Sequence, residues 1–341
     1  MTIQRVACFI AAPFLLSTCA FASEPGTFDR TLMVSGPVTL DIQSGPGGIH
    51  ISPGSSSSVV VHAVIRSVFG RADLGIAEAN ILALQKNPPI EQNGNSIRIG
   101  YAQDPGVLRG VTVTYEIQTP RETQVHASAD AGGILIQGVR GPVDTVNSAG
   151  HTEVNDVEAA LKVTTRAGGI LIRNAGGDVF VRNESGGIQM QSIHGNVDAR
   201  TSSGRIEISD VTGDVQSTTH SASIRMDNIK GAVDAHNTSG SIEAFQTTGT
   251  VQAETASGSI RISQVSPAAI RAVTESGAIR VELARGGGYT LDARSEKGKI
   301  SGKATEGFSR TKEHEHILKG QIGSGGPLVD LDTRSSKIEI D

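Results

Sequence analysis

An 18-residue unit recurs eight times along the middle of the chain, and no other feature constrains the fold as strongly. Internal repetition at a fixed period indicates a solenoid, a propeller or an array, in which each unit packs mainly on its neighbours. Only the last copy is longer, by one residue near Pro267. We number the positions of each copy from 1 to 18, and the copies begin at Ala131, Ala149, Ala167, Ser185, Ser203, Ser221, Ser239 and Ser257.

Three positions of the unit carry the pattern. Position 2 is Gly except at Ala222, position 4 is Ile except at Thr152, and position 17 is always Asn or Thr. Apolar residues also favour positions 6, 9 and 13. Each copy divides into two nine-residue halves, in which alternating apolar and polar residues follow a Gly and lead into a polar corner. Alternation with β-branched residues predicts strands, and the Gly suits a tight corner.

One pair of strands cannot bury its apolar face alone. Stacking the copies in register buries a continuous ladder of Ile and Val, with equivalent residues about 4.8 Å apart. Asn and Thr at position 17 would then hydrogen-bond from coil to coil. A hexapeptide helix is disfavoured because the apolar spacing is not six, and a calcium β-roll because GGxGxDxUx repeats are absent. We therefore predict an all-β fold, a parallel β-solenoid built on 18-residue coils.

Four segments follow from the pattern along the chain: a signal peptide at 1–22, a β-rich capping region with one short helix at 23–130, the regular repeats at 131–275, and irregular coils with a cap at 276–341. The capping region would cover the open end of the two sheets. After the repeats, residues 289–301 and 328–340 each restore a coil-like pattern. The polar stretch at 303–322 is either an excursion or a hairpin.

The capping region contains one helical stretch. The helix is expected to follow Asp73 as its N-cap and to end near Lys86, before two prolines. Its apolar side is expected to comprise Ile76, Ala77, Ile81, Leu82 and Leu84. Alternating residues predict strands at 28–35, 38–43, 59–66, 96–101 and 111–117, and residues 47–51 resemble a single coil.

The first 22 residues predict export. Arg5 supplies a positive charge, residues 6–16 are apolar, and an A-x-A motif predicts cleavage after Ala22. Both cysteines lie in the removed segment, so the mature chain would have neither a disulfide nor a thiol nucleophile. Lipid anchoring at Cys19 is disfavoured because Thr18 is a poor residue before an acylated cysteine. The expected location is the periplasm or the cell exterior.

Composition argues against several kinds of partner. Aromatic residues make up 3% of the chain and Trp is absent, which argues against a site that stacks sugars on rings. The net charge of −5 and a pI near 6.0 disfavour nucleic acid as a partner. The sequence has no run of 18 apolar residues, so a transmembrane helix is not expected.

With these motifs identified, the chain resembles the bacterial putative-adhesin family of β-strand-repeat proteins. The resemblance lies in the serial S-G-x-I-x-[IVM] units with their G-x-V partners, in the strand and Pro-containing turn at 115–121, and in the ending at 330–338. It covers the chain from about residue 37 to the end. It implies a single-stranded, right-handed β-helix, and it implies no particular binding residues because the name adhesin is a fold-level label there.

No catalytic or metal-binding constellation stands out in the sequence. Asp198 and Asp234 would lie about 10 Å apart with Gln216 between them, but they lack the aromatic neighbours that hold a sugar. His314 and His316 provide only two imidazoles, whereas zinc normally needs three or four protein ligands. We therefore predict no catalytic residues, no metal and no cofactor.

Four apolar residues at outward positions suggest a docking patch instead. Leu135 and Leu171 share position 5 two coils apart, while Phe180 and Phe245 are isolated rings on otherwise polar strands. The predicted function is an exported, non-enzymatic binding or structural module of the cell envelope, with an envelope polysaccharide or a surface protein as partner. The alternatives are a carbohydrate-active enzyme on the same fold and a purely structural scaffold.

Overall fold

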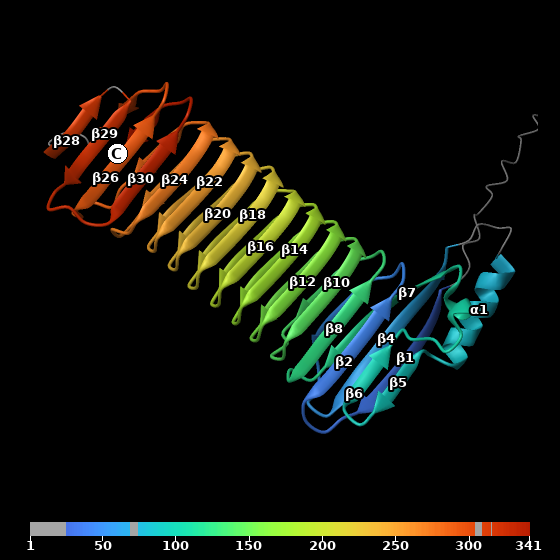
Figure 1. Ribbon diagram of the computed structural model, residues 1–341. Helices are drawn as coiled ribbons and strands as arrows, with labels where there is room; N and C mark the ends of the chain where they lie inside the picture. The colour runs from blue at the N-terminus through green and yellow to red at the C-terminus, as the bar shows by residue number, and fades with distance from the viewer. Residues whose placement is uncertain (1–24, 69–73, 304–308, 315) are drawn as a thin grey trace, which may run out of the picture.

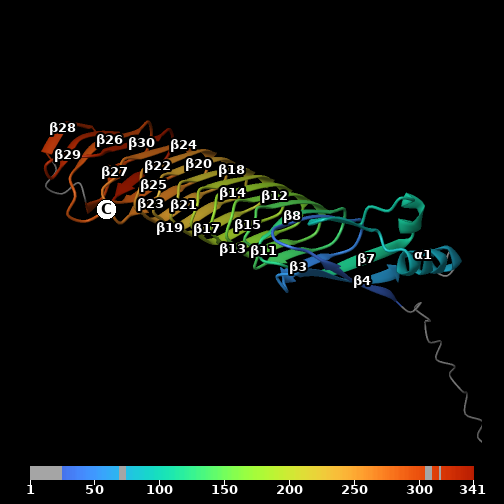
Figure 2. The ribbon, with the colours of Figure 1, turned by 90° about the horizontal axis from the view of Figure 1, so that it is seen from below.

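The computed structural model describes residues 25–68, 74–303, 309–314 and 316–341. It shows an elongated rod in which two β-sheets run along the length of the molecule (Figures 1 and 2). Sheet A has 15 strands and sheet B has 16. The predicted parallel β-solenoid is confirmed, and its right-handed winding stays a prediction. The predicted signal peptide lies outside the described residues, and within these ranges no helix is long and apolar enough to cross a membrane.

Each regular coil contributes one strand to each sheet. The strands of neighbouring coils are parallel and in register, so that Ile188 lies beside Ile206 and Val197 beside Val215. In sheet A these strands are β9 (Ile134–Gln137), β11 (Thr152–Val157), β13 (Ile170–Ala175), β15 (Ile188–Ile193), β17 (Ile206–Val211), β19 (Ile224–Ile229), β21 (Ile242–Thr247), β23 (Ile260–Gln264) and β25 (Ile279–Glu282). In sheet B they are β8 (Thr123–Ala129), β10 (Val143–Ala149), β12 (Leu161–Ala167), β14 (Val179–Ser185), β16 (Val197–Ser203), β18 (Val215–Ser221), β20 (Val233–Ser239), β22 (Val251–Ser257) and β24 (Ile270–Ser276).

The core is a stack of apolar columns between the two sheets. In the coil that begins at Ser185, the buried side chains are those of Ile188, Met190, Ile193, Val197 and Ala199, at positions 4, 6, 9, 13 and 15. Alternate residues of both strands therefore face inward, as the period-two pattern predicts. Because the coils stack in register, each column continues through the rod and excludes water along its length.

The polar column at position 17 is buried, but its bonding differs from the prediction. Its side chains bond mainly to the backbone carbonyl at position 2 of their own coil, as in the bonds from Asn147 Nδ2 to Gly132 O (3.0 Å) and from Thr274 Oγ1 to Gly258 O (3.0 Å). Bonds to the next coil are secondary, such as that from Asn183 Nδ2 to Gly186 O (3.0 Å). Asn and Thr thus close the corner within each coil, because a buried carbonyl there needs a donor.

A second corner has a left-handed residue at position 8. Six residues there have φ between 52° and 60°: Asp156, Asn174, Ser192, Asp210, Asn228 and Gln246. Asn and Asp tolerate this conformation better than other side chains. Asn174 Nδ2 also donates to Asp156 Oδ1 (2.8 Å), and Asn228 Nδ2 to Asp210 Oδ1 (2.7 Å), so the corner side chains form short ladders between coils.

The N-terminal end is capped by an insertion between two stacked coils. The first coil stacks directly on the coil at 123–137, since Leu40 pairs with Val125 and Ile49 with Ile134. The elements of this end are β1 (Gly26–Met33), β2 (Val38–Ser44), β3 (Ile49–Pro53), β4 (Ser58–Ser67), α1 (Leu74–Lys86), β5 (Ile90–Asn93), β6 (Ser96–Ile99), the 3-10 helix η2 (Pro105–Leu108) and β7 (Val111–Thr119). Strands β4 and β7 lie outside the first coil and pair antiparallel.

The predicted helix is confirmed as α1, but its apolar side is narrower than expected. Ala77, Ile81 and Leu84 are buried against the end of the sheets, whereas Ile76 and Leu82 are 54% and 67% exposed. The expectation was wrong for these two residues because they lie on the outer side of the helix. The predicted cap, Asp73, lies outside the described residues.

The C-terminal end reverses the order of two coils. The last coil of the chain stacks on the regular coil, with Ile338 beside Ile279, and the earlier coil at 289–301 packs outside it, with Leu291 beside Val329. The strands are β26 (Tyr289–Ser295), β27 (Ile300–Ser301), β28 (Ser309–His314), β29 (Ile317–Ile322), β30 (Leu328–Thr333) and β31 (Ile338–Ile340). Strands β28 and β29 are antiparallel, so the described part of the polar stretch forms a hairpin.

Candidate functional site

The outward faces of the sheets carry ladders of paired charges. On sheet A, Glu243 accepts from Arg225 Nη1 (2.8 Å) on one side and from Arg261 Nη1 (2.9 Å) on the other. These residues occupy position 5 of three successive coils. Exposed pairs of this kind contribute about 0–1 kcal/mol each to stability. Their main effect is to hold long side chains in defined positions on a rigid surface.

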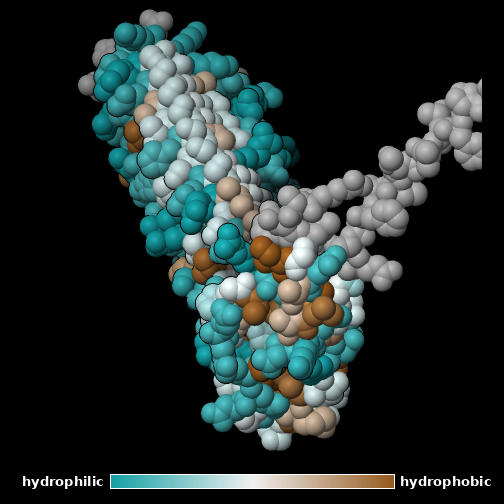
Figure 3. Space-filling model, turned by 90° about the vertical axis from the view of Figure 1, so that its right-hand side faces the viewer, coloured by the Kyte–Doolittle hydropathy of each residue, from teal (hydrophilic) through white to brown (hydrophobic). Residues whose placement is uncertain are grey.

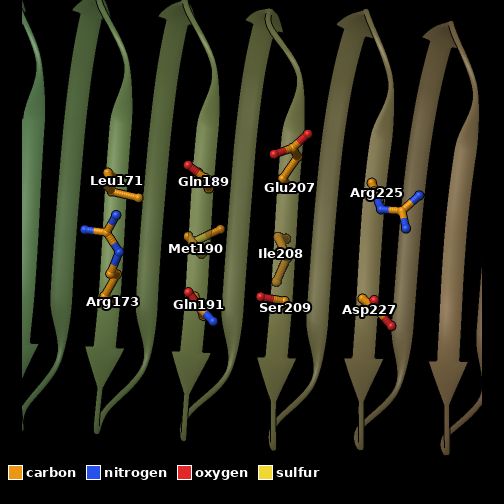
Figure 4. Close-up of a pocket in the computed structure, with 10 residues that line it drawn as sticks. All are labelled: Leu171, Arg173, Gln189, Met190, Gln191, Glu207, Ile208, Ser209, Arg225 and Asp227. Carbon is orange, nitrogen blue, oxygen red and sulfur yellow. The ribbon is translucent and has the colours of Figure 1, made fainter.

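A hollow of about 250 Å³ interrupts the outward face of sheet A, and we call it the sheet A hollow. Figure 4 shows side chains from β13, β15, β17 and β19 around it, with glutamines in its middle and arginines at both ends. The hollow forms because short side chains such as Ser209 stand between the long side chains of neighbouring coils. The polar side chains around it are Arg173, Gln189, Gln191, Glu207, Ser209, Arg225 and Asp227.

Ion pairs with flanking residues hold the charges at the rim of the sheet A hollow. Arg173 Nη1 lies 3.0 Å from Glu153 Oε1, and Arg205 Nη1 lies 3.2 Å from Glu207 Oε1. A hydrogen bond from Asn155 and the nearby Arg173 lower the pKa of Glu153, although partial burial opposes them. Guanidinium, amide, hydroxyl and carboxylate groups therefore converge, which suits a ligand that both donates and accepts hydrogen bonds.

One carboxylate oxygen beside the hollow lacks a partner. Asp227 Oδ1 is buried and has no hydrogen bond within the described residues. Its column neighbours are Ser209 and Phe245, neither of which places a charge against it.

The structure does not bring the four predicted docking residues together. Leu135 and Leu171 share one column with Glu153 between them, as expected, and Leu171 also borders the sheet A hollow. Phe245 is half-buried, with the Arg225 guanidinium 4.9 Å from its ring centre. Phe180 is 50% exposed on β14, in the other sheet. A patch at Leu135 and Leu171 stays a prediction.

The carboxylates considered for catalysis are engaged by neighbouring side chains. Asp198 and Asp234 share a column with Gln216 between them, as expected. Asp198 accepts two bonds from Arg200, of 2.8 and 3.0 Å, and Asp234 lies 2.8 Å from His236 Nε2. These contacts leave the carboxylates as members of ion pairs on an exposed face.

The predicted histidine pair lies at the C-terminal hairpin. The side chain of His314 lies outside what the structure describes, and His316 Nδ1 is 2.9 Å from Gly298 O. In the described part of the chain, no three or more His, Cys, Asp or Glu side chains gather in a metal-binding arrangement.

Sequence reasoning missed Gln189, Gln191, Ser209 and Asp227. A signal for them exists in the alignment of the copies. In successive coils, position 7 is occupied by Arg173, Gln191, Ser209 and Asp227. Side-chain length therefore falls to Ser209 and rises again along this column. A dip in side-chain length on a flat sheet predicts a hollow, because the backbone below it is rigid and level.

A family model matches the second half of the rod. Residues 177–341 match the model described as Toastrack DUF4097. The predicted resemblance to an adhesin-like β-strand-repeat family is confirmed. The matched region begins just before β14 and includes three of the four strands that border the sheet A hollow, β15, β17 and β19. No curated protein matches the chain.

Several solved structures match the chain at low sequence identity. One is described as a "putative cell adhesion protein" from Clostridium sporogenes, with 11% identity over 93% of this chain and 99% of that chain and a TM-score of 0.22. Two from Parabacteroides distasonis are described as a "putative lipid binding protein" and a "putative adhesin". Each has 10% identity over 75% of this chain and 96% of that chain, with a TM-score of 0.35.

Proposed function

We propose that the protein is an exported, non-enzymatic binding module of the cell envelope that contacts its ligand through the outward face of sheet A. The sheet A hollow is the observation that carries this proposal. It presents charged, amide and hydroxyl groups from four successive strands at the fixed spacing of a parallel sheet, about 4.8 Å per strand. A rigid surface binds with little ordering cost, which favours recognition of an extended polymer.

Export and adhesion rest on further support. The N-terminal pattern that ends at Ala22 is that of a signal peptide. The Toastrack match and the adhesion-related names of similar structures agree with a surface role. A polysaccharide of the envelope or a surface protein is the expected partner.

Binding to an array of glycans and envelope fractions tests the proposal, with reducing-sugar and unsaturated-product release measured on every ligand that binds. Saturable binding without product release is the expected result. Product release would instead favour a carbohydrate-active enzyme, and Asp198 and Asp234 would then be substituted first. An array without any saturable binding would contradict the proposal and favour a purely structural scaffold.

A pair of matched variants locates the binding surface. Ser209→Arg fills the sheet A hollow with a long side chain, whereas Ser263→Arg makes the same change on β23, outside the hollow. Both residues are partly exposed on sheet A, so both variants are expected to fold with little loss of stability. Ser209→Arg should weaken binding and Ser263→Arg should not. Equal binding by both variants would place the binding surface elsewhere.

A further inference from the structure

Two arginines on sheet B have no acidic partner. In the described coils between residues 131 and 282, eight arginines lie within 4.0 Å of a carboxylate: Arg140, Arg173, Arg200, Arg205, Arg225, Arg261, Arg271 and Arg280. Arg166 and Arg182 are exposed and reach no carboxylate oxygen within that distance among the described residues. They stand at positions 18 and 16 of neighbouring coils.

Both arginines border the same hollow of about 320 Å³, which we call the sheet B hollow. It lies at the ends of β10, β12 and β14, where position 17 turns inward and leaves positions 16 and 18 as walls. Arg200, beside Arg182 in the next coil, is turned toward Asp198 and Gln216, so its charge is already paired and the hollow stays open. The local charge therefore favours an anion.

Two hydroxyl side chains add polar groups to the border of the sheet B hollow. Ser148 and Thr164 line it and are partly exposed. Asn147 and Asn183 also border it, but they are 1% and 5% exposed and donate inward to glycine carbonyls of the corner. The hollow therefore presents guanidinium and hydroxyl groups, which suit a ligand that carries both a carboxylate and hydroxyls.

The same repeat geometry produces a second hollow farther along the rod, and its charges are different. That hollow is bordered by His220, His236, Glu254 and Glu275. There Glu254 Oε1 lies 3.5 Å from Arg271, and His236 lies 2.8 Å from Asp234. Figure 3 shows a pale band of neutral residues that continues along the solenoid between hydrophilic flanks. The repeat geometry therefore produces the hollows, but the unpaired arginines are found at the sheet B hollow and not at this second hollow.

We propose that the sheet B hollow is a second binding site, separate from the sheet A hollow, and that it binds a uronic-acid residue of an acidic polysaccharide. The Arg166 and Arg182 guanidiniums bind the planar carboxylate through charge-assisted hydrogen bonds. The hydroxyls of Ser148 and Thr164 form hydrogen bonds with those of the sugar. Glu184 at the rim and the net charge of −5 oppose a densely charged polyanion such as a nucleic acid.

Binding of polygalacturonate, with its methyl-esterified form as the uncharged control, tests this inference. The wild-type protein should bind polygalacturonate and lose affinity at least tenfold for the ester. The double variant Arg166→Gln/Arg182→Gln should lose about tenfold or more in affinity, the range expected for charge-assisted bonds. Arg285→Gln is the matched control, because Arg285 is an exposed arginine without a carboxylate partner within the described residues and lies away from the hollow.

The outcomes separate this inference from the proposed function. Equal affinity of the double variant and Arg285→Gln, equal binding of the ester, or tighter binding of single-stranded DNA than of polygalacturonate would overturn the inference. If other glycans of the array bind and polygalacturonate does not, the inference fails and the proposed function stands. If no ligand of the array binds, both fail. Circular dichroism and thermal unfolding verify that every variant is folded.

Discussion

Ala222 occupies the one strained position in the column of corner glycines within the repeats. Its φ is 112°, in the left-handed half of conformational space, which six other copies enter with Gly at this position. The junction is looser there: Gly204 N lies 3.3 Å from Ser221 O, whereas Gly168 N lies 2.9 Å from Ser185 O. A residue with a Cβ atom in such a conformation costs about 1–3 kcal/mol.

Replacing this residue by glycine should therefore stabilise the rod. Ala222→Gly relieves the backbone strain. It also gives the unfolded chain more conformational entropy, which lowers the free energy of unfolding by about 0.5–1 kcal/mol. The expected net gain is about 1 kcal/mol. It corresponds to a rise of about 0.3 M in the urea midpoint if the slope is near 3 kcal/mol/M. Amide hydrogen exchange at Gly204 should slow as its bond to Ser221 shortens.

The reverse substitution is the control. A Cβ atom at Gly168 would lie 2.0 Å from Gly150 O, and φ there is 139°, so Gly168→Ala should lose about 2 kcal/mol or more. Urea unfolding followed by circular dichroism measures both variants. A midpoint for Ala222→Gly that equals or falls below that of the wild-type protein would refute the reasoning about strain at this corner.

Three further predictions concern single residues. Leu171→Glu should leave the unfolding midpoint unchanged and weaken partner binding, and unchanged binding would remove Leu171 from the interface. Burial opposes ionisation of Asp292, but hydrogen bonds from Arg294 and Lys319 outweigh it and lower its pKa. Because the folded pKa lies below the unfolded value near 4, Asp292→Asn should cost about 1 kcal/mol at pH 7. This loss shrinks as the pH falls from the unfolded pKa to below the folded pKa, and a pH-independent difference in urea unfolding would contradict it. Zinc should not raise the melting temperature, and a rise that His316→Ala abolishes would reveal a metal site.

Much of the fold could be read from local patterns. Ile at position 4 and Val at position 13 recur with a period of 18, and period-two alternation around them places their side chains inward. Such patterns can be read locally because every coil packs on adjacent coils of the same kind, so each strand buries the same positions. The sheet A hollow was not predicted, because it depends on side-chain lengths in three adjacent coils. That Arg166 and Arg182 reach no carboxylate within the described residues was likewise not predictable, because ion pairs on a sheet depend on rotamers and register.

The sequence by itself determined the coil length, the inward columns, the helix near residues 73–86 and the resemblance to a β-strand-repeat family. Only the tertiary structure decided which coils are neighbours at the two ends. Coils with equivalent apolar columns can stack in more than one order. The coil at 328–340 lies between the regular repeats and the coil at 289–301, and this order follows from how the whole end packs. The bonding of Asn147 was decided in the same way: the nearest unpaired carbonyl lay within its own coil, and a buried amide bonds the acceptor within its reach.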